Sequence, residues 1–95
     1  MITTTFQIDA SHPSLSGHFP GNPIVPGVVL LDRVAAEVER GLNARLRTLP
    51  QVKFMRPLKP EERACLTIDY TAPTGHFVIK CGDEVVAKGT FEVSA

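Results

Sequence analysis

Residues 9–27 form the segment that most restricts how this 95-residue chain can fold. They read DASHPSLSGHFPGNPIVPG and include four prolines and three glycines. Both residue types interrupt helices and strands, so this segment must be a long loop. Loops of this length inside a small domain are usually functional. We therefore expect a shaped loop that carries part of a site, with regular secondary structure on either side.

The residues around the loop predict one helix and about five strands. Residues 2–8 alternate between apolar and polar side chains, as a half-buried strand does. From Gly27 to Arg40 the apolar residues recur at helical spacing, with Pro26 suited to the first helical position and Gly41 to the stop. The first turn of this helix is apolar on every side, so we expect protein around it. Further alternating segments follow near 52–54, 66–70, 77–81 and 85–93.

Thr74-Gly75 and Gly82-Asp83-Glu84 read as the hairpin turns that join the last strands. One helix that buries its apolar side against one antiparallel sheet makes the fold class α+β. The length of the chain fits a single domain over residues 1–95.

Composition excludes several classes of protein. Ten basic and ten acidic residues give a net charge of zero, so nothing favours nucleic acid or an anionic membrane as the partner. No apolar run approaches the roughly 20 residues of a membrane span. The first residues lack the pattern of a secretory signal, which predicts a cytoplasmic protein. Cys65 and Cys81 are expected to be reduced thiols in or beside the core.

The stretch from His18 to Asp32 carries the candidate chemistry. His18 has a pKa range suited to a general base near neutral pH. The free N–H groups of Gly27 and Val28, at the start of the helix, suit an oxygen that gains negative charge. Asp32 suits an acid if burial raises its pKa. These parts fit proton abstraction beside a carbonyl followed by loss of a leaving group, with no metal or organic cofactor signature in the sequence.

The same stretch, HFPGNPIVPGVVLLD, resembles the 3-hydroxyacyl-[acyl-carrier-protein] dehydratases. Their signature is His-Phe-x-Gly-x-Pro-x-x-Pro-Gly, followed by a helix with an acidic residue. The matching positions here are His18, Phe19, Gly21, Pro23, Pro26 and Gly27, and Asp32 falls on the acidic position. Segments 52–60 and 83–89 are similar to the strand and the hairpin that follow the family's helix.

The resemblance implies a hot-dog fold, with the helix Gly27–Arg40 wrapped by the sheet. It also implies a homodimer with the site at its interface, whether or not dimers assemble further, and a thioester substrate on acyl carrier protein or coenzyme A. By this analogy His18 is the base, Asp32 handles the departing hydroxyl, the Gly27 N–H binds the thioester carbonyl and the Ile24 carbonyl orients the imidazole. The substrate-binding positions are Phe19, Ile24, Gly27 and Val28.

Two other functions fit such a chain: a silent hot-dog protomer that binds acyl chains or pairs with an active partner, and an acyl-thioester hydrolase. The pair His18 and Asp32 favours the lyase. Asp32 and the HFPG loop point to different branches of the family, so isomerase activity is not assigned, and fatty-acid and polyene or pigment pathways both stay open. Arg56, Lys59 and Arg63 are either solvated charges or contacts for a phosphopantetheine arm or an acidic carrier protein.

Overall fold

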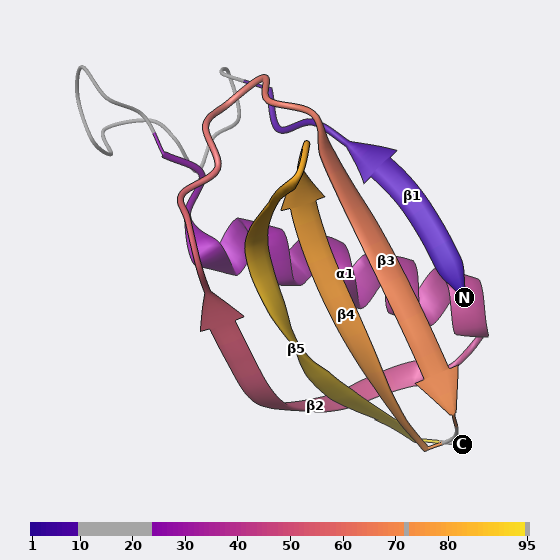
Figure 1. Ribbon diagram of the computed structural model, residues 1–95. Helices are drawn as coiled ribbons and strands as arrows, with labels where there is room; N and C mark the ends of the chain where they lie inside the picture. The colour runs from indigo at the N-terminus through magenta and orange to yellow at the C-terminus, as the bar shows by residue number, and fades with distance from the viewer. Residues whose placement is uncertain (10–23, 72, 95) are drawn as a thin grey trace.

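The computed structural model describes residues 1–9, 24–71 and 73–94, which form one helix and a five-stranded antiparallel sheet. The elements are β1 (Ile2–Phe6), α1 (Gly27–Leu42), β2 (Arg45–Phe54), β3 (Ala64–Thr71), β4 (Thr74–Cys81) and β5 (Glu84–Ser94). The strands lie in the order β1-β3-β4-β5-β2, and α1 runs across one face of the sheet (Figure 1). The predicted α+β hot-dog architecture is confirmed.

The core lies between α1 and the face of the sheet that it covers. Val34 and Val38 of the helix are fully buried, and Val29 and Leu30 nearly so. The sheet contributes alternate residues of its central strands, as period-two patterning requires: Ala64, Leu66, Ile68, Phe77, Ile79, Ala87, Phe91 and Val93. α1 is not long and apolar enough to cross a membrane, and it is the only helix in the described part of the chain.

The predicted end of the helix is wrong by two residues. α1 continues through Gly41 to Leu42, and Asn43 adopts the left-handed conformation that ends it, with φ at 51°. Asparagine tolerates this conformation better than most residues. Gly41 serves packing instead, because a Cβ there would lie 2.6 Å from Cδ1 of Ile2.

The sheet departs from the predicted pattern at β2 and β5. β2 is ten residues long, whereas the alternation near 52–54 indicated only its end. Its pairing with β5 shifts register twice between Leu46 and Gln51, so the period of two is lost there. A further shift between β4 and β5 buries both Val86 and Ala87 and displaces Val85 from the face predicted for it.

The first hairpin turn also lies elsewhere than predicted. Thr71 pairs with Thr74, so the chain reverses before Thr74-Gly75. Gly75 is a buried residue of β4, where its missing side chain leaves room for the ring of Phe91. The turn at Gly82 is confirmed: Cys81 pairs with Glu84 and Gly82 has a positive φ of 61°.

Candidate active site

Among the described residues, the backbone N–H groups of Gly27 and Val28 at the N-terminus of α1 have no hydrogen-bond partner. Pro26 is the N-cap and provides no side-chain cap, and the first turn contains no acidic residue. Within the described residues, no hydrogen bond uses the N–H of Gly27 or Val28. The first N–H groups of a helix also carry the positive end of its dipole. This helix end can therefore stabilise an oxygen that becomes negatively charged during a reaction.

Phe54, at the end of β2, lies against Gly27. A Cβ at position 27 would stand 2.8 Å from Cζ of Phe54, closer than real Cβ atoms approach another heavy atom. Glycine therefore brings this aromatic ring next to the free donors. Alanine would fit only if the ring moved.

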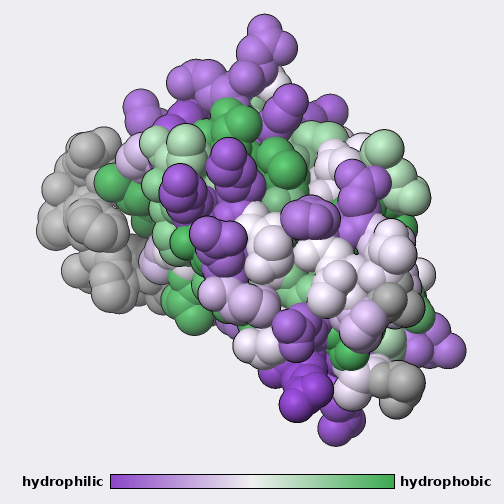
Figure 2. All heavy atoms as spheres, turned by 60° about the horizontal axis from the view of Figure 1, so that its bottom comes forward, coloured by the Kyte–Doolittle hydropathy of each residue, from purple (hydrophilic) through white to green (hydrophobic). Residues whose placement is uncertain are grey.

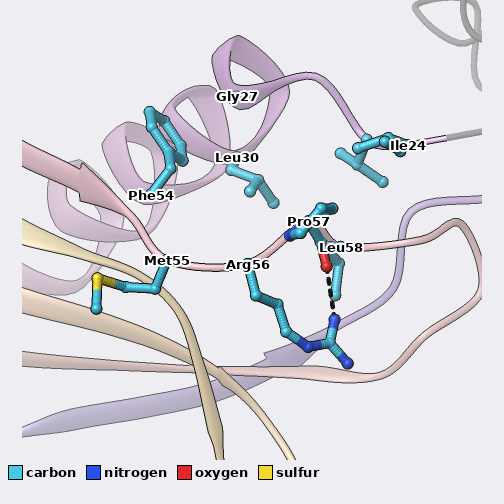
Figure 3. A pocket seen from close by; sticks show the side chains of 9 residues that line it. Ile24, Gly27, Leu30, Phe54, Met55, Arg56, Pro57 and Leu58 are labelled. Carbon is cyan, nitrogen blue, oxygen red and sulfur yellow. Dashed lines mark hydrogen bonds between the residues drawn. The ribbon is translucent and has the colours of Figure 1, made fainter.

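An apolar cavity of about 460 Å³ opens beside the same helix end (Figure 3). Its volume lies within the range of roughly 300–1,000 Å³ that is usual for ligand sites. One wall is the start of α1 with the residues before it, and the other is the segment that leaves β2. The lining residues are Ile24, Val25, Gly27, Leu30, Phe54, Met55, Arg56, Pro57 and Leu58. The cavity is suited to an apolar chain whose polar end lies near the helix donors.

An ion pair between Arg56 and Glu62 holds the second wall in place from the side that faces away from the cavity. Arg56 donates from Nη1 and Nη2 to the two carboxylate oxygens of Glu62, at 3.1 and 3.0 Å. Its Nε lies 3.5 Å from an oxygen of Glu84. The guanidinium, helped by the backbone N–H of Lys59, lowers the pKa of Glu62 to about 2, and the hydrogen bonds to Glu62 raise the pKa of Arg56. Arg56 is therefore engaged in an ion pair within the chain and is not the solvated charge that was one of the two expectations from the sequence; its contact with a carrier stays a prediction.

Asp32 lies away from this cavity. Its side chain is exposed and lines a separate hollow of about 400 Å³ together with Gln7, Ile8, Asp9, Val29, Arg33 and Ala36. Gly27 and Asp32 thus open onto different hollows of one chain. The burial that the sequence interpretation required for Asp32 to act as an acid does not occur within this chain.

Within this single chain, protein covers only part of the first turn of α1: Val29 and Leu30 are buried, whereas Val28 is open. Val28 is 64% exposed, and Phe54 and Met55 beside the cavity are 53% and 54% exposed. Figure 2 likewise shows apolar atoms open at the surface among hydrophilic ones. Large apolar groups gathered at a surface commonly mark an interaction site.

Of the predicted site residues, Ile24 and Gly27 line the cavity, whereas Val28 and Asp32 do not. His18 and Phe19 lie outside the described residues, as does the loop residue His12. The sequence interpretation missed the wall from Phe54 to Leu58 as a lining segment. The signal in the sequence that could have indicated this wall is the pair of opposite charges, Arg56 and Glu62, on either side of the prolines at 57 and 60.

Comparisons with known proteins agree with the predicted resemblance. The model of the ApeI-like family, described as ApeI dehydratase, matches residues 1–90. A 3-hydroxyacyl-[acyl-carrier-protein] dehydratase FabZ from Syntrophomonas wolfei is 28% identical over 99 residues, covering 90% of this chain and 69% of the relative. The protein of the same name from Levilactobacillus brevis is 28% identical over 110 residues, covering 99% of this chain and 74% of the relative.

Solved structures share the fold. A chain of the dehydratase heterocomplex ApeI:P from Xenorhabdus doucetiae superposes with a TM-score of 0.86 at 23% identity, covering 98% of this chain and 86% of that one. The fluoroacetyl-CoA-specific thioesterase FlK superposes with a TM-score of 0.71 at 12% identity, covering 99% of this chain and 88% of that one. The same architecture therefore occurs in a dehydratase complex and in a thioesterase, and the fold alone does not choose between them. The family model makes the choice: because it spans residues 1–90, the chain belongs to the ApeI-like dehydratase family.

Proposed function

We propose that this protein is a hydro-lyase that converts a 3-hydroxyacyl thioester into the 2-enoyl thioester. The observation that carries this proposal is the N-terminus of α1, whose first N–H groups have no partner within the described residues and which opens onto an apolar cavity. A thioester carbonyl needs a donor for its developing charge, and an acyl chain needs apolar surface. The match to a dehydratase family indicates that the reaction served by the helix donors and the cavity is a dehydration.

The reaction would use the residues that the sequence interpretation named. His18 takes a proton from C2, and the charge that develops on the thioester oxygen is held by the Gly27 N–H. The C2=C3 double bond forms as the C3–O bond breaks, and Asp32 supplies the proton with which the hydroxyl leaves as water. The Ile24 carbonyl orients the imidazole, and Phe19 and Val28 contact the substrate. Each role is a proposal.

We also propose that the site is completed by a second copy of the chain. Three features support this: Gly27 and Asp32 open onto different hollows, Val28 and Phe54 are exposed, and β2 is an edge strand of the described sheet. In a symmetric pair, His18 of one protomer would act with Asp32 of the other. The related ApeI:P complex is a heterocomplex, so a different hot-dog chain is the alternative partner.

The substrate carrier in this proposal is acyl carrier protein, which the names of both FabZ relatives include. The pathway is fatty-acid synthesis or synthesis of polyene chains, and the cytoplasmic location expected from the sequence belongs to the same proposal.

The test is incubation with a 3-hydroxyacyl-carrier thioester, followed by separate assays for the enoyl product and for free thiol. Enoyl product without thiol release supports the lyase. Thiol release would instead indicate a hydrolase, and neither product would indicate a silent protomer, in each case contradicting the proposal.

A further inference from the structure

The cavity wall formed by residues 55–58 belongs to no helix or strand of the described chain. It leaves the sheet where the N–H groups of Met55 and Arg56 bond to the Val86 carbonyl, at 2.8 and 3.3 Å. Beyond that point no strand pairing fixes its path. Other contacts must therefore set the distance between this wall and α1.

Arg56 supplies those contacts from the back of the wall. In Figure 3 its guanidinium turns away from the helix and bonds to the Pro57 carbonyl, at 2.6 Å. Its two bonds to Glu62 form a planar, two-point contact that has essentially one orientation. Glu62 in turn accepts the N–H of Lys59 at 2.8 Å and the thiol of Cys81 at 3.6 Å. The ion pair thus closes segment 56–62 on itself and holds it against β4.

A backbone hydrogen bond links segment 56–62 to the residues that precede α1 on the opposite wall of the cavity. The Leu58 carbonyl accepts the N–H of Val25 at 2.8 Å, and the side chains of both residues are buried. Val25 directly precedes Pro26, the N-cap of α1. A shift of the wall would therefore change both the width of the cavity and the approach of the chain to Gly27.

From this geometry we infer that Arg56 and Glu62 are positioning residues that set the size of acyl chain the cavity accepts. The inference rests on the proposed function for the identity of the ligand. Neither side chain takes part in the chemical step. The pair acts through Leu58 and Pro57, and its loss widens or loosens the cavity.

The test compares Arg56→Lys and Glu62→Gln with the control Glu84→Gln. Lysine keeps the charge but loses the two-point contact, and glutamine keeps the shape but loses the charge. The Glu84 side chain is 70% exposed and touches Arg56 only through Nε, so its loss should change little. Turnover is measured with 3-hydroxybutanoyl, 3-hydroxydecanoyl and 3-hydroxytetradecanoyl pantetheine.

In the two wall variants we expect KM for the preferred chain to rise about 10-fold, while kcat changes little and the preference for chain length weakens. One missing or extra methylene in an apolar pocket is worth about 10-fold or more, so a shift of this size is measurable. Glu84→Gln should match the wild type. A uniform loss of kcat that follows the folded fraction, or an unchanged length profile, would overturn the inference.

A binding measurement separates this inference from the proposed reaction. S-decyl-pantetheine, a thioether that can be neither dehydrated nor hydrolysed, is titrated into the wild type and the variants by calorimetry. Weaker binding in the wall variants alone supports the positioning role even if the wild type turns over no substrate, in which case only the proposed reaction fails. Equal binding by all four proteins contradicts the positioning role, and no binding by the wild type contradicts the acyl cavity itself.

Discussion

Gly27 is the residue at which helix end, aromatic ring and cavity meet. A methyl group there would contact the ring of Phe54, which is half-exposed, so we expect the ring to shift toward solvent and the fold to survive. The ring or the methyl would then occupy the space in front of the free donors. We predict that Gly27→Ala lowers kcat/KM by about 10-fold or more, since misplacement by about 1 Å can cost 10²-fold.

Gly41→Ala is the matched control, because Gly41 lies in the same helix but away from the cavity. Its added methyl would meet Ile2, so some stability should be lost while the activity of each folded molecule stays normal. Thermal unfolding and steady-state kinetics measure the two quantities. Equal activity losses in both variants would contradict a special role for Gly27.

Glu62 makes the fold sensitive to acid in a defined range. Arg56 holds its pKa at about 2, below the ordinary value of 4.5, so the unfolded chain takes up this proton more readily than the folded one. The stabilisation is therefore complete above about pH 4.5 and is lost as the pH falls toward 2. We predict that the difference in unfolding free energy between wild type and Glu62→Gln shrinks over this range. Urea titrations between neutral pH and pH 2 measure it, and a constant difference would disprove the linkage.

At the residue scale, the sequence motif predicts the place of Gly27, but no motif predicts the cavity wall. His18, Gly27 and Asp32 belong to one continuous pattern, and Gly27 does lie at the helix start. Phe54 and Glu62 have no such pattern, because their roles depend on contacts with residues far along the chain. The exposure of Asp32 was also not foreseen, since neighbouring leucines say nothing about which side of the helix a residue occupies.

Among the elements, those with uninterrupted periodicity were predicted well. The strands that contribute alternate buried residues, β3 and β4, follow the period of two, and α1 follows the helical spacing. β2 was mostly missed because it contains Pro50 and two register shifts, features that edge strands tolerate. The helix was predicted too short because glycine usually marks a helix end, whereas Gly41 lies inside α1 and packs closely against Ile2 of β1.

The pairing of β2 with β5 depends on the absence of a side chain at Gly89. Gly89 pairs with Val52, and a Cβ there would collide with the backbone carbonyl of Gln51 and with the ring of Phe77. A backbone atom inside a sheet cannot move aside as a flexible side chain can. We predict that Gly89→Ala costs about 1–3 kcal/mol of unfolding free energy, as overpacking typically does.

Urea unfolding of Gly89→Ala measures that cost, and Lys88→Ala is the control because its side chain is exposed on the same strand. The variant should also bind S-decyl-pantetheine more weakly, since β2 ends at Phe54 on the cavity wall. Stability within about 0.5 kcal/mol of the wild type, the usual range for surface changes, would show that the sheet adjusts freely.

At the scale of the whole molecule, the described residues of one chain do not bring the parts of the proposed site together. The helix donors and the apolar cavity lie on one side of α1, and the carboxylate of Asp32 lies on another. The apolar side chains of Val28, Phe54 and Met55 are exposed to solvent. The fold class was predictable because one helix and one sheet can bury each other in few ways. The proposed division of the site between two copies rests on the family resemblance, since no local pattern in a sequence records which residues face a partner.

Mixing two inactive variants tests this division. We predict that His18→Ala and Asp32→Asn each lower turnover by about 10²-fold or more, as loss of a positioned acid or base does. Asp69→Asn, which alters an exposed carboxylate on β3, should not. If His18 of one protomer acts with Asp32 of the other, each mixed dimer holds one site with both lesions and one site with neither. Random re-pairing puts about half of the protein in mixed dimers, so about a quarter of the wild-type activity should return.

The mixing experiment needs proof that subunits exchange, which tags of different mass on the two variants provide. Activity should then rise together with the fraction of mixed dimers and should stay absent when either variant is re-paired with itself. If mixed dimers form and no activity returns, His18 and Asp32 act within one chain, because every site in the mixture would then keep one lesion. A chain that stays monomeric alone but gains activity with a different hot-dog subunit would replace the homodimer with a heterodimer, and the same pair of variants would then show which subunit supplies the base and which the acid.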